Sequence, residues 1–134
     1  MPSLESHIES ARSLIKDIEE KLRLETAVER QKLVGFACSE VSCDLLAILM
    51  HKKNLIDPGF NINHRFFASE RTAKEKFPLD FPAKRALMPQ MVRQEELRNL
   101  LCYGKPKGAG LVEEAVKNLF DIKKIIEKES GEKI

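Results

Sequence analysis

The stretch that decides the fold is residues 27–53, which read AVERQKLVGFACSEVSCDLLAILMHKK. Its apolar residues recur at intervals of three and four, the spacing of one face of an α-helix. That face comprises Val34, Ala37, Cys38, Val41, Leu45, Ile48 and Leu49, and Leu33, Phe36 and Leu46 widen it. A helix that is apolar on several sides is surrounded by other elements. We therefore predict a long central helix, capped by Thr26, in which Leu45 and Ile48 are fully buried.

Helical spacing recurs on both sides of this central helix. The further segments are residues 4–22, 64–76, 82–101 and 111–129. Pro89 lies inside the third of these and predicts a kink or a fresh start there. No segment alternates apolar and polar residues over the length of a strand. The predicted fold is all-α: an up-and-down four-helix bundle with one short extra helix in the middle connection, followed by a frayed tail at residues 130–134.

Length and composition limit the classes of protein that this chain can be. Its 134 residues form one domain, residues 1–134, with 43% hydrophobic and 33% charged residues. The net charge of +2 is too small to indicate nucleic-acid binding by itself. The longest apolar run, residues 45–50, is too short for a membrane span, and the first ten residues carry no signal-peptide pattern. We therefore expect a cytoplasmic protein with no membrane association.

The metal-ligating residue types show no ligand pattern in the sequence. The three cysteines include Cys38 and Cys43, whose spacing of five suits neither a zinc knuckle nor a redox pair. The three histidines are far apart, and we expect each to be satisfied by an ordinary neighbour. The sequence therefore predicts free thiols, no metal and no cofactor.

The candidate functional stretch is residues 95–107, EELRNLLCYGKPK. It reads as the end of an amphipathic helix, because Gly104 supplies the conformational freedom that a helix C-terminus needs. Arg98 and Tyr103 are separated by about one and a half turns, beside Lys105 and Lys107. This arrangement is typical of an ordinary helix end, and it also suits a site for a phosphate ester.

An acidic pair on the central helix is the second candidate feature. Glu40 and Asp44 are one turn apart and share a face. They have either a catalytic role or a structural one, in which they face solvent or pair with lysine or arginine on a neighbouring helix.

The string ELRNLLCY at residues 96–103, with the order of the helices, resembles the HEPN superfamily and most closely its HepT-like branch. In that family a late helix carries Arg-Asn, three mostly apolar residues and His, often followed by another residue and Tyr. Arg98 and Asn99 match the Arg-Asn, and residues 100–102 match the apolar triplet. Glu40 and Asp44 resemble the acidic pair of the family's long helix. Tyr103 stands where the family has its His.

The resemblance implies a homodimer formed through the helices that carry Arg98, encoded beside a minimal nucleotidyltransferase as a toxin–antitoxin-type pair. It implies RNA as substrate or ligand, with Arg98, Asn99 and Tyr103 as the catalytic positions. Lys105 and Lys107, which lie beside this helix end, are the predicted RNA-binding residues. Family members that cleave RNA do so without metal. A phenol is a poor base at neutral pH, so the Tyr103 substitution predicts a weak or inactive endoribonuclease.

Two alternatives to this interpretation remain open. The first is a non-enzymatic helical dimer that binds a nucleotidyltransferase or a nucleotide. The second is an unrelated helical scaffold in which Arg98 forms only a structural ion pair.

Overall fold

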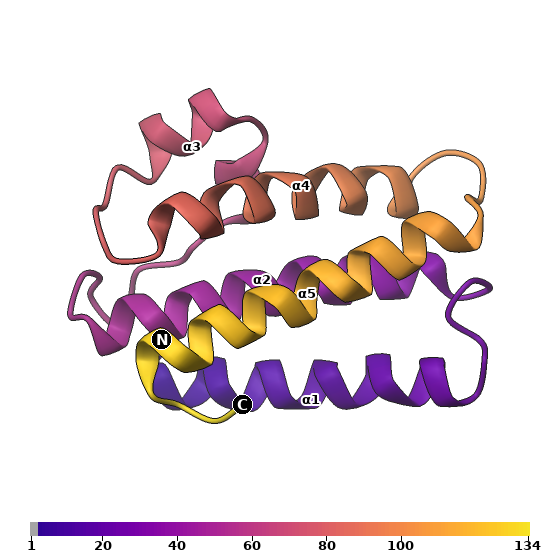
Figure 1. Cartoon of the computed structure of the whole chain (residues 1–134), viewed down its shortest axis with the longest axis horizontal. Helices are drawn as coiled ribbons and strands as arrows, with labels where there is room; N and C mark the ends of the chain where they lie inside the picture. The colour runs from indigo at the N-terminus through magenta and orange to yellow at the C-terminus, as the bar shows by residue number, and fades with distance from the viewer. Residues whose placement is uncertain (1–2) are drawn as a thin grey trace.

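The computed structural model describes residues 3–134, and within this range it is all-α, with five α-helices and no strand. The elements in chain order are α1 (Leu4–Arg23), α2 (Gln31–Lys52), the 3₁₀ turn η1 (His64–Phe67), α3 (Glu70–Lys76), α4 (Lys84–Cys102) and α5 (Ala109–Ser130). Consecutive long helices run in opposite directions, and α3 lies on the outer side of α4 (Figure 1). The arrangement is helical-bundle-like, and it confirms the prediction that the fold is all-α.

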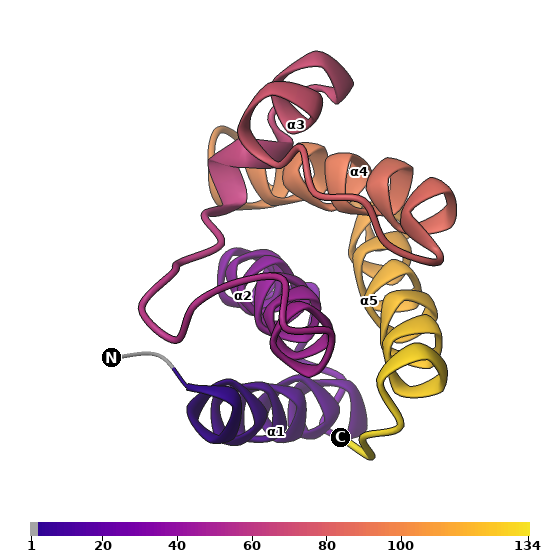
Figure 2. The ribbon, with the colours of Figure 1, turned by 90° about the vertical axis from the view of Figure 1, so that its left-hand side faces the viewer.

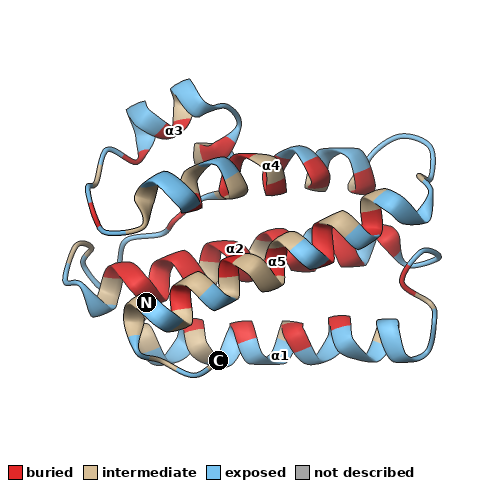
Figure 3. Cartoon of the chain, viewed as in Figure 1, coloured by how far each residue is buried: buried red, intermediate tan, exposed pale blue. Residues whose placement is uncertain are grey.

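Helix α2 is the central element. It contacts α1, α4 and α5, and the end-on view shows these three helices around it (Figure 2). Residues 45–50 are all 0% exposed, so the predicted burial of Leu45 and Ile48 is confirmed. Buried residues are densest along α2 (Figure 3). By length and composition alone α2 could cross a membrane, but 78% of its most apolar window is buried inside the protein, as in a core helix.

The start of α2 differs from the prediction. The Thr26 hydroxyl donates to the carbonyl of Lys21 at 3.4 Å instead of capping a helix, and Glu25 takes the left-handed conformation with φ 57°. The next four residues form turns, so α2 begins at Gln31. The predicted cap by Thr26 is wrong, because its hydroxyl is turned back toward the end of α1.

Local capping explains the other boundaries. Ser3 and Ser6 exchange reciprocal hydrogen bonds at the start of α1, with Ser6 in the position that a glutamate usually takes. The segment predicted as one short helix is two elements, because Ser69 accepts a hydrogen bond from the backbone of Thr72 and starts α3 anew. Helix α4 passes through Pro89 as one element, so no fresh start occurs there.

The C-terminal residues pack back onto the helices, and the predicted fraying is wrong. The Ile134 amide donates to Glu127 Oε2 at 2.9 Å, and Arg12 Nη2 donates to the carbonyl of Lys133 at 2.8 Å. Lys52 and Glu132 form an ion pair at 3.0 Å. The tail therefore links α5 to both α1 and α2.

Candidate functional site

Arg98 lies near the end of α4 and reaches across to α2. Its Nη1 donates to Ser39 Oγ at 3.2 Å and to Glu40 Oε1 at 3.0 Å. The guanidinium carbon lies 5.0 Å from the centre of the Phe36 ring, which is a cation–π distance. Only 11% of the Arg98 side chain is exposed, against 40% of Glu40. The arginine is therefore held in one position by α2, while Glu40 and Phe36 beside it are partly open to solvent.

A close approach of α2 and α4 makes this contact possible. A Cβ added to Gly35 would lie 2.8 Å from Leu101 Cβ and 3.5 Å from Cys102 Sγ. The Cys102 thiol donates to the carbonyl of Lys32 at 3.3 Å. Glycine is thus the residue that lets the two backbones come this close, and the close packing brings Arg98 within reach of α2.

The two carboxylates of the predicted acidic pair serve different partners. Glu40 forms an ion pair with Arg98 on the neighbouring helix α4. This is the structural alternative that the sequence allowed for Glu40. Asp44 instead accepts from His7 Nδ1 of α1 at 2.8 Å. The structure therefore brings Glu40 to Arg98 and does not bring Asp44 there.

Asn99 and Tyr103 lie on the outer side of the end of α4. Asn99 is exposed, and Tyr103 is 66% exposed. Tyr103 follows the last helical residue with extended backbone, and Gly104 comes next with φ 76°, as predicted for this helix end. Among residues 3–134 no hydrogen bond joins Tyr103 to Arg98, so the two side chains do not form a single preorganised pair within one chain.

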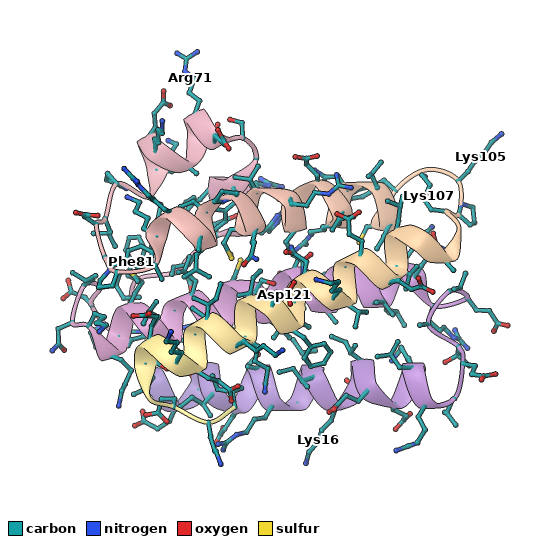
Figure 4. All side chains as sticks on the ribbon, in the orientation of Figure 1. Lys16, Arg71, Phe81, Lys105, Lys107 and Asp121 are labelled. Carbon is teal, nitrogen blue, oxygen red and sulfur yellow. The ribbon has the colours of Figure 1, made fainter. Side chains whose placement is uncertain are left out.

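The loop after α4 is fastened by Gln31. The Gln31 Oε1 accepts from the Lys107 amide at 2.6 Å, and its Nε2 donates to the Lys107 carbonyl at 2.9 Å. The Lys107 Nζ donates to the Lys105 carbonyl at 2.6 Å. The Lys105 side chain points outward at the edge of the molecule (Figure 4). Of the two predicted RNA-binding lysines, Lys105 is the one whose amine extends away from the protein.

A histidine–glutamate pair adjoins Arg98 and was missed in the sequence. His64 Nδ1 lies 2.8 Å and 2.9 Å from the two carboxylate oxygens of Glu95, which is one turn before Arg98 on α4. The Glu95 side chain is only 6% exposed. The two residues are 31 positions apart, and no local pattern signals their contact.

The cysteines near this site are not reactive thiolates. Burial raises the pKa of the Cys43 thiol, and the carboxylates of Glu40, Asp44 and Glu95 raise it further. Burial also raises the pKa of Cys102, although Arg98 and Lys32 act in the other direction. Neither thiol is therefore set up as a nucleophile at neutral pH.

Two histidine rings lie side by side between the start of α1 and the end of α2. The rings of His7 and His51 have their centres 5.6 Å apart with a tilt of 33°. Burial lowers the pKa of His51, His7 lowers it further, and Glu5 partly offsets both effects. Among residues 3–134 no three histidine, cysteine, aspartate or glutamate side chains form a metal-binding group.

A cleft of about 630 Å³ lies between α3 and the start of α4, away from Arg98. Its lining includes Phe81, Met88 and Pro89 on the apolar side and Lys74, Lys84 and Arg85 on the basic side. The cleft therefore shares no residue with the predicted site.

Comparison of this chain with models of known protein families, with characterised proteins and with solved structures finds no match.

Proposed function

We propose that this chain is a HepT-like HEPN protein whose ribonuclease motif is degenerate. The proposal includes the finer fold description, an up-and-down four-helix bundle of α1, α2, α4 and α5 with α3 as the short extra helix. It also includes a cytoplasmic location and a minimal nucleotidyltransferase as the partner protein. The support for the family is the Arg98-Asn99 string at the end of a late helix, together with the order of the helices.

The observation that carries the proposal is the setting of Arg98. A guanidinium held between Ser39, Glu40 and the Phe36 ring is fixed in position while the adjoining surface is open. Its hydrogen bonds to α2 run from Nη1. The fork of an arginine has further donors, which suit bidentate contact with a phosphate. Lys105 extends from the loop just beyond and adds positive charge at the same end of α4.

A second copy of the chain is the proposed cover for the face beside Arg98. Leu33 and Phe36 occupy the exposed face of α2 and are 54% and 44% exposed, although the sequence pattern predicted them for the core. Neighbouring exposed apolar side chains next to a fixed arginine are typical of an interface. Pairing of this face across a two-fold axis would bring two Arg98 side chains together and build one composite site.

Analytical ultracentrifugation tests this assembly. We expect a dimer at micromolar concentration and a monomer for Phe36→Glu, because the new charge would be buried in the interface. Phe60→Glu is the matched control: Phe60 is 40% exposed but lies in the linker after α2. If the natural chain is a monomer, or if both variants dissociate alike, the composite site is wrong.

The chemistry at position 103 decides between cleavage and binding alone. A phenol has a pKa of about 10, so it can donate a proton but is a poor base at pH 7. Tyr103 is also 66% exposed, outside the environment that tunes a catalytic group. This exposure favours the second candidate function, a non-enzymatic dimer that binds a nucleotidyltransferase or a nucleotide.

Replacement of Tyr103 tests the assignment directly. The natural protein should cut a mixed single-stranded RNA weakly or not at all, and Tyr103→His should raise the rate by about 10²–10⁴, the usual contribution of an acid–base group. Adding Arg98→Lys should abolish most of that gain, because lysine keeps the charge but not the fork. Adding Arg71→Ala is the control, since the Arg71 side chain is 90% exposed and points away from α4 (Figure 4).

The outcomes separate the interpretations. If the natural protein cuts well and Arg98→Lys has no effect, the site assignment is wrong. If neither the natural protein nor Tyr103→His cuts, the binding function replaces the nuclease. Lys105→Ala should only weaken RNA binding and reduce its dependence on salt.

A further inference from the structure

The contact between the first turns of α1 and the last turn of α2 contains two ring nitrogens with no partner. His7 Nε2 and His51 Nε2 are both buried, and neither has a hydrogen-bond partner among residues 3–134. His7 as a whole is only 9% exposed. Buried polar atoms are normally paired, and each exception calls for a specific explanation such as a bound water or ion. Two such atoms on neighbouring rings point to one shared ligand.

Asp44 fixes the chemical form of His7. Its carboxylate oxygen can only accept, so the 2.8 Å contact with His7 Nδ1 places the proton on Nδ1. In the neutral ring, Nε2 then carries a lone pair and no hydrogen. A carboxylate that orients a histidine through one nitrogen, with the other nitrogen turned to an ion, is the usual support of a metal-bound imidazole.

The separation of the two rings fits a common ion. Two imidazoles that share a tetrahedral zinc at Zn–N distances of about 2.0–2.1 Å have ring centres roughly 5–6 Å apart. The centres of His7 and His51 are 5.6 Å apart. A hydrogen bond between the two nitrogens would also satisfy them, but none is formed.

We propose that His7 and His51 bind a divalent transition-metal ion, with Zn²⁺ as the reference ion. Nε2 of each histidine is a ligand, and Asp44 orients His7. Imidazole nitrogen suits zinc, nickel and copper, whereas magnesium prefers oxygen. This proposed site departs from the sequence-based expectation of no metal, and it lies about three turns of α2 beyond Glu40, separate from Arg98.

The ion would link α1 to α2. His7 is in the first turn of α1, and His51 is in the last turn of α2. A ligand that binds only the folded chain raises its stability by mass action. With two protein ligands the affinity is modest, so the effect depends on the concentration of free metal.

Thermal unfolding with and without Zn²⁺ tests the proposal, together with isothermal titration calorimetry in a buffer that does not chelate the ion. We expect one ion per chain and a rise in Tm of roughly 5 °C or more at a ~100-fold excess over Kd. His7→Ala and His51→Ala should each abolish this metal-dependent rise, and Mg²⁺ should give none. The measured quantity is the difference in Tm with and without metal, so a variant whose Tm is lower in the absence of metal can still be tested.

His64→Ala is the matched control. His64 also has a carboxylate partner, Glu95, but its Nε2 is not a buried unpaired atom. The variant should therefore keep the full response to Zn²⁺. Asp44→Asn should weaken binding by about 10–100-fold without abolishing it, as expected of a residue that acts through His7.

A second readout covers the case in which His7→Ala does not fold. In the natural protein, Zn²⁺ should shift the imidazole NMR signals of His7 and His51 and leave those of His64 in place. The proposal is overturned if Zn²⁺ neither binds nor raises Tm, if His64→Ala loses the response equally, or if the signals of His64 alone move.

Discussion

Gly35→Ala is the substitution that most directly tests the packing of α2 against α4. The added methyl carbon would lie 2.8 Å from Leu101 Cβ and 3.4 Å from Leu101 Cδ1. Carbon atoms in contact prefer about 3.5–4.0 Å, so the helices must separate by roughly 1 Å at this point. Leu101 Cβ cannot rotate away, because it is fixed to the backbone of α4.

The size of the effect follows from two opposing terms. Overpacking of a tight core contact costs about 1–3 kcal/mol. Alanine in place of glycine inside a helix recovers about 1 kcal/mol. We therefore expect the free energy of unfolding to fall by roughly 0–2 kcal/mol for Gly35→Ala, measured by urea denaturation.

Gly110→Ala provides the reference. Gly110 also lies in a helix, near the start of α5, and an added Cβ would meet nothing within 4 Å. This variant should gain helix propensity without clash, so it should exceed Gly35→Ala in stability by about 1–3 kcal/mol. If the two variants are equally stable, α2 and α4 do not approach each other as described, and the position of Arg98 loses its structural basis.

Three further outcomes are expected. Leu45→Ala should lower the free energy of unfolding by about 2–5 kcal/mol, since Leu45 is 0% exposed, and a loss under about 1 kcal/mol in urea would contradict its central position. Cys102 is half-buried whereas the other two cysteines are buried, so a thiol reagent should label one thiol per native chain, and Cys102→Ser should remove that reaction. Hydrogen bonding and charge from Arg93 hold the pKa of Glu114 below its ordinary value of 4.5, so the pair stabilises the fold above that pH and the effect is lost as pH falls through the lower folded pKa. Urea denaturation should therefore show Glu114→Gln less stable than the natural chain at about pH 7 and equal to it near about pH 2.

The helices were predictable where a continuous apolar period determines them. Helix α5 was expected at residues 111–129 and occupies Ala109–Ser130, because its stripe is unbroken. The start of α2 was not predictable, because the Thr26 hydroxyl donates to the carbonyl of Lys21 in α1 instead of capping α2. Periodicity also placed Leu33 and Phe36 in the core, yet both are exposed. A pattern shows that a face is apolar, but the number of neighbours available to cover it is a property of the tertiary fold.

The contacts of the candidate site were likewise predictable only in part. The contact of Glu40 with a cation on another helix was one of the two alternatives read from the sequence. The histidine contacts with Asp44 and Glu95 join residues 37 and 31 positions apart, so no spacing rule could find them. Charge and helix spacing predict which residues are available for pairing, whereas the partner depends on how the helices cross.

The attachment of α1 has a consequence for motion. Among the helices of residues 3–134, α1 packs against α2 alone, and the hydrogen bond from Arg12 to the Lys133 carbonyl ties it to the C-terminal tail. Helix α1 can therefore open while α2, α4 and α5 stay packed against one another. Its amide protons should exchange with solvent sooner than those of residues 45–50 of α2, which are all 0% exposed.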